Sequence, residues 1–279
     1  MKKNILIPTD FSVNATSAMD YALKLYANEN CNFYFLHSWS FSESSTRTYI
    51  TTDYIDQLKV DSINALNALK DRVENTNSNT EHSFEIVHSA ERLTDAIDTA
   101  IKSFNIDLII MGTKGATGAK EIFLGSNTVK VIQKNKQCPV LIVPDGFIYK
   151  KPKQIAFPTD YKRFYGEEII ELKRLSELNE STIEILHITE EEELTELQDY
   201  NYTMLKLYLK DLDYSFHSMP NLTNKTLIIQ DFIEQQKIDV LVMINYKHSF
   251  IENIIKEPII RKIGFQPTIP FLVIPCRTQ

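Results

Sequence analysis

The sequence predicts an α/β protein made of two tandem doubly wound domains, each a five-stranded parallel sheet with helices on both faces. Short β-branched runs alternate with longer segments of helical periodicity. This alternation occurs twice along the 279 residues. Alternation of strands and helices is typical of parallel strands joined by crossover helices, so we expect a Rossmann-like architecture in each half.

An internal repeat divides the chain into two copies of one domain. Four motifs of the first half recur in the same order in the second half: 5–10 as 155–160, 36–37 as 186–187, 107–111 as 239–243, and 139–144 as 270–275. We therefore expect one domain at 1–147 and a second at 152–279. The joint lies near 145–153, which contains Gly146, Pro152 and three lysines. A joint this short favours a packed pair of domains, an intramolecular pseudo-dimer.

The elements of the first copy follow from its residue pattern. Short apolar runs between turn residues predict strands, and 107–111 and 139–143 are nearly continuous apolar runs, as parallel strands covered on both faces should be. Apolar residues at helical spacing predict the helices, for example Ala15, Ala18, Met19, Ala22, Leu23 and Tyr26 along 14–28. In chain order we expect strand 4–8, helix 14–28, strand 32–38, helix 53–74, strand 83–88, helix 91–105, strand 107–111, helix 126–135 and strand 139–143.

The second copy repeats this order with shorter connections. The same two patterns predict strands 154–158, 182–188, 213–218, 239–244 and 270–275, and helices 165–178, 191–211, 223–237 and 251–263.

Composition excludes several classes of protein. The net charge is −7, whereas a duplex nucleic-acid binder needs a surplus of Lys and Arg on one face. No apolar run approaches the roughly 20 residues that span a bilayer, and the N-terminus lacks the pattern of a signal peptide. Three cysteines without metal-ligand spacing fit a reducing cytoplasm, and we expect Cys31, Cys138 and Cys276 to be small buried hydrophobic residues.

A cluster of glycines follows the predicted strand 107–111. The chain has only seven glycines, and four of them, Gly112, Gly115, Gly118 and Gly125, fall within fourteen residues. Glycine lets the backbone approach a ligand closely, and successive exposed N–H groups can surround an anion. Ser126 follows as a good N-cap of helix 126–135, whose N-terminus offers unpaired N–H groups. In this context we favour a phosphate cradle over glycines that only make turns. Gly118 lies outside the motif and can serve the turn alone.

Three other residues at or near strand ends have competing interpretations. Asp10, at the end of the first strand, could accept from a ribose hydroxyl or bind Mg²⁺ beside phosphates. It could equally cap helix 14–28. Lys114 could neutralise phosphate charge or be a solvated loop lysine. His37, like His187 of the second copy, is better explained as a structural strand-end histidine than as a catalytic one.

The chain resembles a universal stress protein in its tandem form. The resemblance covers nearly the whole chain. It rests on Pro8-Thr9-Asp10-Phe11-Ser12, on Leu36-His37, and on Gly112-x2-Gly115-x9-Gly125-Ser126 followed by Pro139-Val140.

The resemblance implies an ATP-binding, doubly wound fold that dimerises through its last strand. It implies that Pro8, Thr9 and Asp10 surround the adenosine and that Ser38 contacts adenine through its backbone. Ribose and phosphates would be held by Met111, Gly112, Lys114, Gly115, Gly125, Ser126 and Asn127.

The second copy departs from this motif. Aligned on Met243, Gly112 is replaced by Ile244 and Gly115 by Lys247, and Lys256-Glu257-Pro258 stands where Gly125-Ser126 would fall. Bulky side chains would block the backbone from a phosphate, and Glu257 would repel it. We therefore expect a single nucleotide site, in the first copy, with the second copy as its fixed structural partner.

The sequence leaves three functions open. The first is an ATP-binding stress-response regulator, the second a slow ATPase or phosphotransferase, and the third a scaffold that binds no nucleotide. Without a visible nucleophile–base pair, the chain is at most a slow ATPase. Its expected partners are an adenine nucleotide, a possible second copy of the chain, and unidentified proteins. The insertion 39–52, rich in Ser and Thr and found in the first copy alone, could be a flap over the nucleotide or an ordinary surface loop.

Overall fold

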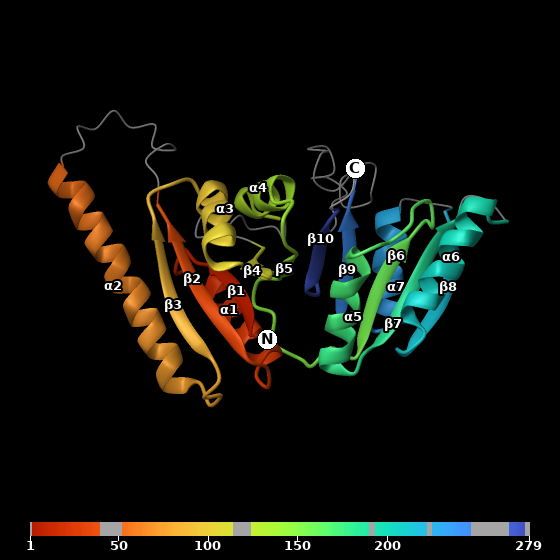
Figure 1. Cartoon of the computed structure of the whole chain (residues 1–279), viewed down its shortest axis with the longest axis horizontal. Helices are drawn as coiled ribbons and strands as arrows, with labels where there is room; N and C mark the ends of the chain where they lie inside the picture. The colour runs from red at the N-terminus through yellow and green to blue at the C-terminus, as the bar shows by residue number, and fades with distance from the viewer. Residues whose placement is uncertain are drawn as a thin grey trace. The chain divides into compact units, whose positions relative to one another are not determined.

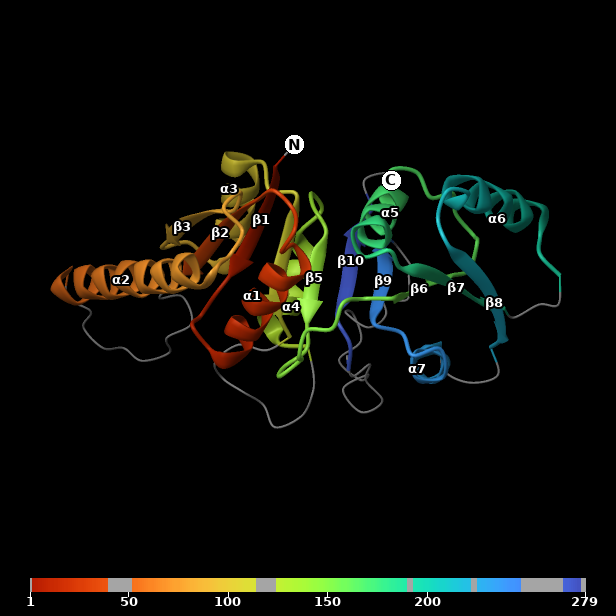
Figure 2. The same cartoon turned by 90° about the horizontal axis from the view of Figure 1, so that it is seen from below.

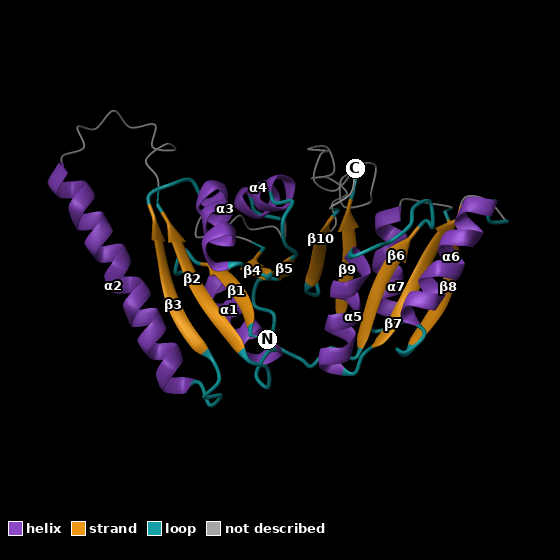
Figure 3. Cartoon of the chain, viewed as in Figure 1, coloured by secondary structure: helices purple, strands orange, loops and turns teal. Residues whose placement is uncertain are grey.

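The computed structural model describes residues 2–39, 52–113, 124–189, 193–221, 225–246 and 268–276. The chain divides into two compact units, Met1–Tyr149 and Lys150–Gln279. Each unit alternates strands and helices in the predicted way (Figure 3). We describe each unit by itself, as unit 1 and unit 2.

Unit 1 alternates five strands with four helices among its described residues. They are β1 (Lys3–Pro8), α1 (Val13–Leu25), β2 (Cys31–Ser38), α2 (Thr52–Thr76), β3 (Ser83–Ser89), α3 (Leu93–Phe104), β4 (Leu108–Gly112), α4 (Ser126–Lys134) and β5 (Val140–Val143).

Unit 2 repeats the same alternation. Its described elements are β6 (Gln154–Thr159), α5 (Glu168–Asn179), β7 (Thr182–Thr189), α6 (Glu196–Leu209), β8 (Tyr214–Pro220), α7 (Lys225–Gln235), β9 (Val240–Asn245) and β10 (Phe271–Pro275). The expected helix 251–263 lies outside the described residues.

Both sheets are parallel and have the same strand order. In unit 1 the strands follow β3-β2-β1-β4-β5, and in unit 2 β8-β7-β6-β9-β10 (Figure 1). The prediction of a doubly wound parallel fold is therefore confirmed. In this order the chain reverses its direction of travel between β1 and β4, and in such sheets ligands bind at the carboxyl ends of the strands beside that reversal.

Several helix boundaries differ from the sequence-based ones. Helix 191–211 begins only at Glu196, because Thr195 and Gln198 form a capping box in which each side-chain oxygen accepts a hydrogen bond from the other residue's backbone N–H. Helix 91–105 ends at Phe104, where Asn105 takes a left-handed conformation with φ 49°. The remaining ends move by one to three residues, as frayed termini do.

The apolar faces of two helices also differ from prediction. In α1 the buried residues include Tyr21 and Leu25, and Leu23 is only half-buried. Long helix α2 runs beside β3 in both views (Figures 1 and 2) and buries only Ser62, Leu66 and Val73 of its 25 residues. The other apolar positions predicted for it stay half-buried, because this helix lies toward the edge of the sheet: Ile55, Leu58, Ile63 and Leu69.

Two cysteines match the expectation and the third does not. Cys31 and Cys138 are buried, but Cys276 is half-buried and its Sγ accepts a hydrogen bond from Arg163 Nη1 at 3.0 Å. Of the described helices, none has the length and apolar character needed to cross a membrane.

Candidate functional site

The carboxyl end of β1 forms a tight turn held by its own side chains. Thr9 Oγ1 accepts from Phe11 N at 3.0 Å, and Asp10 Oδ1 accepts from Ser12 N at 3.1 Å. These bonds hold Phe11 at φ 63°, a left-handed conformation that is costly for a residue with a side chain. Asp10 is exposed at the end of the strand.

The alternative role of Asp10 as a helix cap is wrong. Ser12 caps α1, since its side chain accepts from Ala15 N at 3.2 Å. Asp10 instead orders the backbone of the capping residue, and its exposed position leaves it accessible to a ligand at the strand end.

The end of β2 is bound to the same turn. His37 Nδ1 donates to Thr9 O at 2.7 Å, and the His37 ring packs on Phe11 with centroids 4.7 Å apart. Ser38 ends β2, and its Oγ donates to Glu91 O at 2.6 Å. The turn at Pro8, Thr9 and Asp10 is thus bonded to β2 through Leu36 and His37, directly before Ser38, with His37 in the structural position expected of it.

The end of β4 is joined to the start of α4. Gly125 N donates to Thr113 O, and Thr128 Oγ1 donates to Gly112 O at 3.0 Å. Both bonds connect the two ends of the glycine-containing segment. Met111 and Gly112 therefore lie near Gly125, Ser126 and Asn127, which are far along the chain from β4. Lys114, Gly115 and Gly118 lie outside the described residues.

The N-cap of α4 is Gly125, and the expectation that Ser126 would cap this helix is wrong. Ser126 is the first helical residue, exposed together with Asn127. A glycine has no side chain to accept from the first turn, and no described side chain caps it, so among the described residues the N–H groups of that turn are available to a solvent molecule or an anion.

Internal packing explains why residue 112 is a glycine, apart from any approach of a phosphate. A Cβ at this position would lie 2.8 Å from Cγ and Oδ1 of Asn14, a side chain of α1 that is 5% exposed. The missing side chain thus accommodates internal packing against Asn14, and the expected role of Gly112 at a phosphate stays a prediction. Asn14 was not identified from sequence, because a lone polar residue beside an apolar helix face carries no pattern.

Thr113 is a second residue that sequence reasoning missed. It is fully buried, and its Oγ1 makes no hydrogen bond within the described part of the chain. A buried hydroxyl without a partner is uncommon and costly. Its place directly after Gly112 is where a polar ligand is expected.

Metal binding was proposed for Asp10. Across the residues that the structure describes, no group of three or more His, Cys, Asp or Glu side chains could hold a metal ion. A role of Asp10 in Mg²⁺ binding stays a prediction. In it Asp10 would supply one oxygen ligand and a bound phosphate would supply others.

Unit 2 has the same strand-one turn. Tyr161 replaces Phe11, with φ 53°, and Thr159 Oγ1 accepts from Tyr161 N at 3.0 Å. His187 stacks on Tyr161 with centroids 4.4 Å apart and donates from Nδ1 to Thr159 O at 3.2 Å. Burial lowers the pKa of His187, as expected for an imidazole that stays neutral inside a fold.

Beyond that turn, unit 2 places its own side chains at the strand ends. Tyr246 follows β9 where Lys114 follows β4, and its hydroxyl contacts Asp160 Oδ1 at 3.4 Å. The Arg163 guanidinium lies 4.8 Å from the Tyr246 ring centroid and pairs with Glu168 at 2.9 Å. These contacts join the end of β6 to the end of β9 through protein groups.

Comparison with known proteins identifies the family. Residues 1–144 match the universal stress protein family. The chain belongs to the universal stress protein family. A universal stress protein of Bacillus subtilis is 27% identical over 159 residues, which are 51% of this chain and 99% of that protein. A universal stress protein of Methanocaldococcus jannaschii is 54% identical over 48 residues, only 17% of this chain and 24% of that protein.

A likeness in fold extends across the whole chain. The crystal structure of a universal stress protein from Archaeoglobus fulgidus covers 98% of this chain, and 96% of that chain is covered, with a TM-score of 0.72 and 16% identity. At this identity the likeness shows a shared fold.

Proposed function

We propose that the chain is an ATP-binding stress-response regulator with one nucleotide site, in the domain 1–147. The observation that carries the proposal is the pair of bonds that brings Gly112–Thr113 to the start of α4, where the N-cap Gly125 has no side chain to cap the helix. A backbone turn beside open helix N–H groups is a favourable environment for phosphate. The partnerless hydroxyl of Thr113 adds a polar group at the same place.

The residues present suit a nucleotide. Asp10 and Ser38, at the ends of β1 and β2, would face the adenosine. Ser126 and Asn127 would hold phosphates with their N–H groups, beside Gly125. ATP, when bound, would supply the phosphate charge that Mg²⁺ and Lys114 neutralise. In the domain 152–279, Arg163 and Tyr246 already contact the groups at the corresponding strand ends, so we infer that this half binds no nucleotide in the same way.

Calorimetric titration with ATP, with and without Mg²⁺, tests the proposal. We expect saturable binding of one ATP per chain. Asp10→Asn should weaken it and reduce the effect of Mg²⁺, whereas Asp160→Asn, the equivalent change in unit 2, should leave it unchanged. If millimolar ATP does not bind the wild-type protein, the proposal is wrong and the scaffold function is favoured.

A second pair of variants tests the phosphate cradle. Gly125 has φ −60° and ψ 152°, which a valine can adopt, so Gly125→Val should remove ATP binding by covering the first turn of α4 without unfolding the protein. Gly115→Val should act in the same direction. Gly166→Val, before α5 of unit 2, is a control for a glycine-to-valine change outside the candidate site. Phosphate release measured over hours separates a slow ATPase or phosphotransferase from a protein that only binds.

We further infer a cytoplasmic protein that pairs with a second copy of itself and with other proteins. Cell fractionation tests the location. Sedimentation at several concentrations, with and without ATP, tests the self-association.

A further inference from the structure

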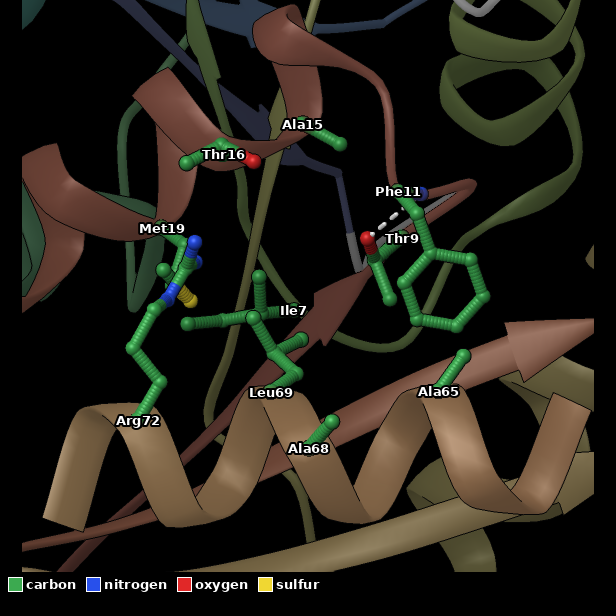
Figure 4. Close-up of a pocket in the computed structure, with 10 residues that line it drawn as sticks. All are labelled: Ile7, Thr9, Phe11, Ala15, Thr16, Met19, Ala65, Ala68, Leu69 and Arg72. Carbon is green, nitrogen blue, oxygen red and sulfur yellow. Dashed lines mark hydrogen bonds between the residues drawn. The ribbon is translucent and has the colours of Figure 1, made fainter.

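Unit 1 contains a hollow that borders the candidate nucleotide site at Thr9. It has a volume of about 300 Å³ and lies between β1, α1 and α2 (Figure 4). Of the described nucleotide candidates, only Thr9 lines it. The lining residues are Ile7, Thr9, Phe11, Ala15, Thr16, Met19, Ala65, Ala68, Leu69 and Arg72.

Small side chains at helical spacing create this hollow. Ala65, Ala68 and Leu69 recur at i, i+3 and i+4 along α2, and Arg72 follows at i+7, so all four face α1. Larger side chains at 65 and 68 would fill the gap. The hollow also accounts for the half-burial of Leu69, which borders open space instead of packed neighbours.

Most of the described lining residues are apolar; Thr9 and Thr16 are polar, and Arg72 is the one charged residue among them. Ile7, Ala15 and Met19 are buried and form the floor, while Ala68 and Arg72 are exposed, so the mouth opens to solvent. Among the residues that the structure describes, no Asp or Glu lines the hollow. Within the described residues, no acidic side chain pairs with Arg72. Figure 4 shows the guanidinium beside Met19, at the other end of the hollow from the Phe11 ring.

We propose that this hollow binds a small amphipathic carboxylate, with its apolar part on Ile7, Met19 and Leu69 and its carboxylate on Arg72. An apolar cavity of about 150 Å³ binds benzene, so the volume here suits a ligand on the order of ten to twelve non-hydrogen atoms. Guanidinium pairs with carboxylate through two parallel hydrogen bonds. The Thr9 hydroxyl, which already accepts from Phe11 N, can donate its own proton toward a polar atom of the ligand.

Octanoate and 3-phenylpropionate are suitable probes. We expect both to bind the full chain and to shift the methyl NMR signal of Met19, which is buried in the floor. Octylamine should not bind, and octanol should bind more weakly than octanoate. Equal binding of the amine and the carboxylate would overturn the role of Arg72, and no binding of any probe would overturn the site.

Two pairs of variants locate the binding. Arg72→Gln should weaken octanoate about tenfold or more, whereas Lys70→Gln, on the same helix but away from the hollow, should not. Ala68→Phe should abolish binding of every probe, whereas Asn67→Phe, exposed on the neighbouring position, should not. Far-UV circular dichroism confirms that each variant folds. Unchanged octanoate binding in Ala68→Phe would overturn the proposal.

This proposal does not depend on the nucleotide site, and the experiment separates the two. We expect octanoate to bind equally in the Gly125→Val variant, and ATP not to displace it. Displacement of octanoate by ATP would show that the hollow is part of the nucleotide site and would overturn the assignment of a second ligand.

Discussion

Phe11 and Tyr161 occupy the same left-handed position at the end of the first strand of each copy, 150 residues apart. In both, a threonine hydroxyl accepts from the strained residue's N–H, and a histidine ring packs on its aromatic ring. The turn is thus a structural unit that survives in the copy without the glycine motif. Its threonine and histidine are therefore weak evidence for nucleotide binding.

Gly112→Ala should destabilise the protein even without a ligand. The added Cβ would meet the buried Asn14 amide at 2.8 Å, and overpacking of this kind costs about 1–3 kcal/mol in the free energy of unfolding. Urea denaturation measures the loss. Gly166→Ala is the control, because its Cβ would meet only ordinary contacts at 3.6 Å or more. Equal stability of the two variants would contradict the packing explanation.

We expect the fluorescence of Trp39, the chain's single tryptophan, to report the protonation of His88. Trp39 Nε1 donates to His88 Nε2 at 2.6 Å, a bond that requires neutral His88. Burial lowers the pKa of His88, and the electrostatic effects of His37 and Lys59 act in the same direction. The bond therefore contributes stability above the ordinary imidazole pKa of about 6.5 and is lost as the pH falls below it.

A fluorescence titration of Trp39 should show a midpoint below about pH 6.5. His88→Gln should remove the transition, because the remaining amide does not titrate. A midpoint at or above the ordinary imidazole value would show that burial does not dominate at this site.

The insertion 39–52 begins at Trp39 and could be a flap or an ordinary surface loop. Its residues 40–51 lie outside the described residues, so both interpretations stay predictions.

At the scale of elements, capping residues explain where sequence periodicity placed helices wrongly. The helix predicted over 191–211 begins before the first residue of α6, Glu196. The Thr195–Gln198 capping box marks the start of the helix. At α4 the predicted first residue, 126, was right, but the predicted capping residue was wrong. Serine is a common N-cap, yet Gly125 takes that position, because Thr128 and the Thr113 carbonyl anchor the helix start from β4.

Thr195→Ala should cost about 1 kcal/mol in the free energy of unfolding, because the backbone N–H of Gln198 loses its acceptor. Thermal denaturation followed at 222 nm, the usual helix signal, measures it. Thr195→Ser keeps the hydroxyl and should restore most of the stability. A serine variant as unstable as the alanine one would mean that the hydroxyl does not account for the cap.

At the scale of the whole molecule, the two copies share a strand order and differ at their strand ends. In unit 1 the ends of β1 and β4 carry Asp10 and the Gly112–Thr113 turn. In unit 2 the equivalent ends are joined by Tyr246 and Asp160, with Arg163 on the Tyr246 ring. The same architecture thus supports a candidate site in one copy and self-contained contacts in the other.

Hydrogen exchange with and without ATP should distinguish the copies. We expect ATP to slow exchange at the carboxyl ends of β1 and β4 and at the start of α4, because bound ligand stabilises the state that binds it. The corresponding ends of β6 and β9 should not change. Equal protection in both units would contradict the proposal of a single site.

Local patterns were enough to predict the order of elements, the two copies and the family. Strand alternation, helix periodicity and repeated motifs depend on neighbours within a few residues, so they are visible in the chain itself. Contacts between distant segments were not predictable in this way. Asn14 beneath Gly112, buried Thr113, the hollow between α1 and α2, and Arg163 beside Tyr246 all arise where parallel strands bring segments together. Packing and hydrogen bonding across the fold set those positions, because they depend on which strands become neighbours in the sheet.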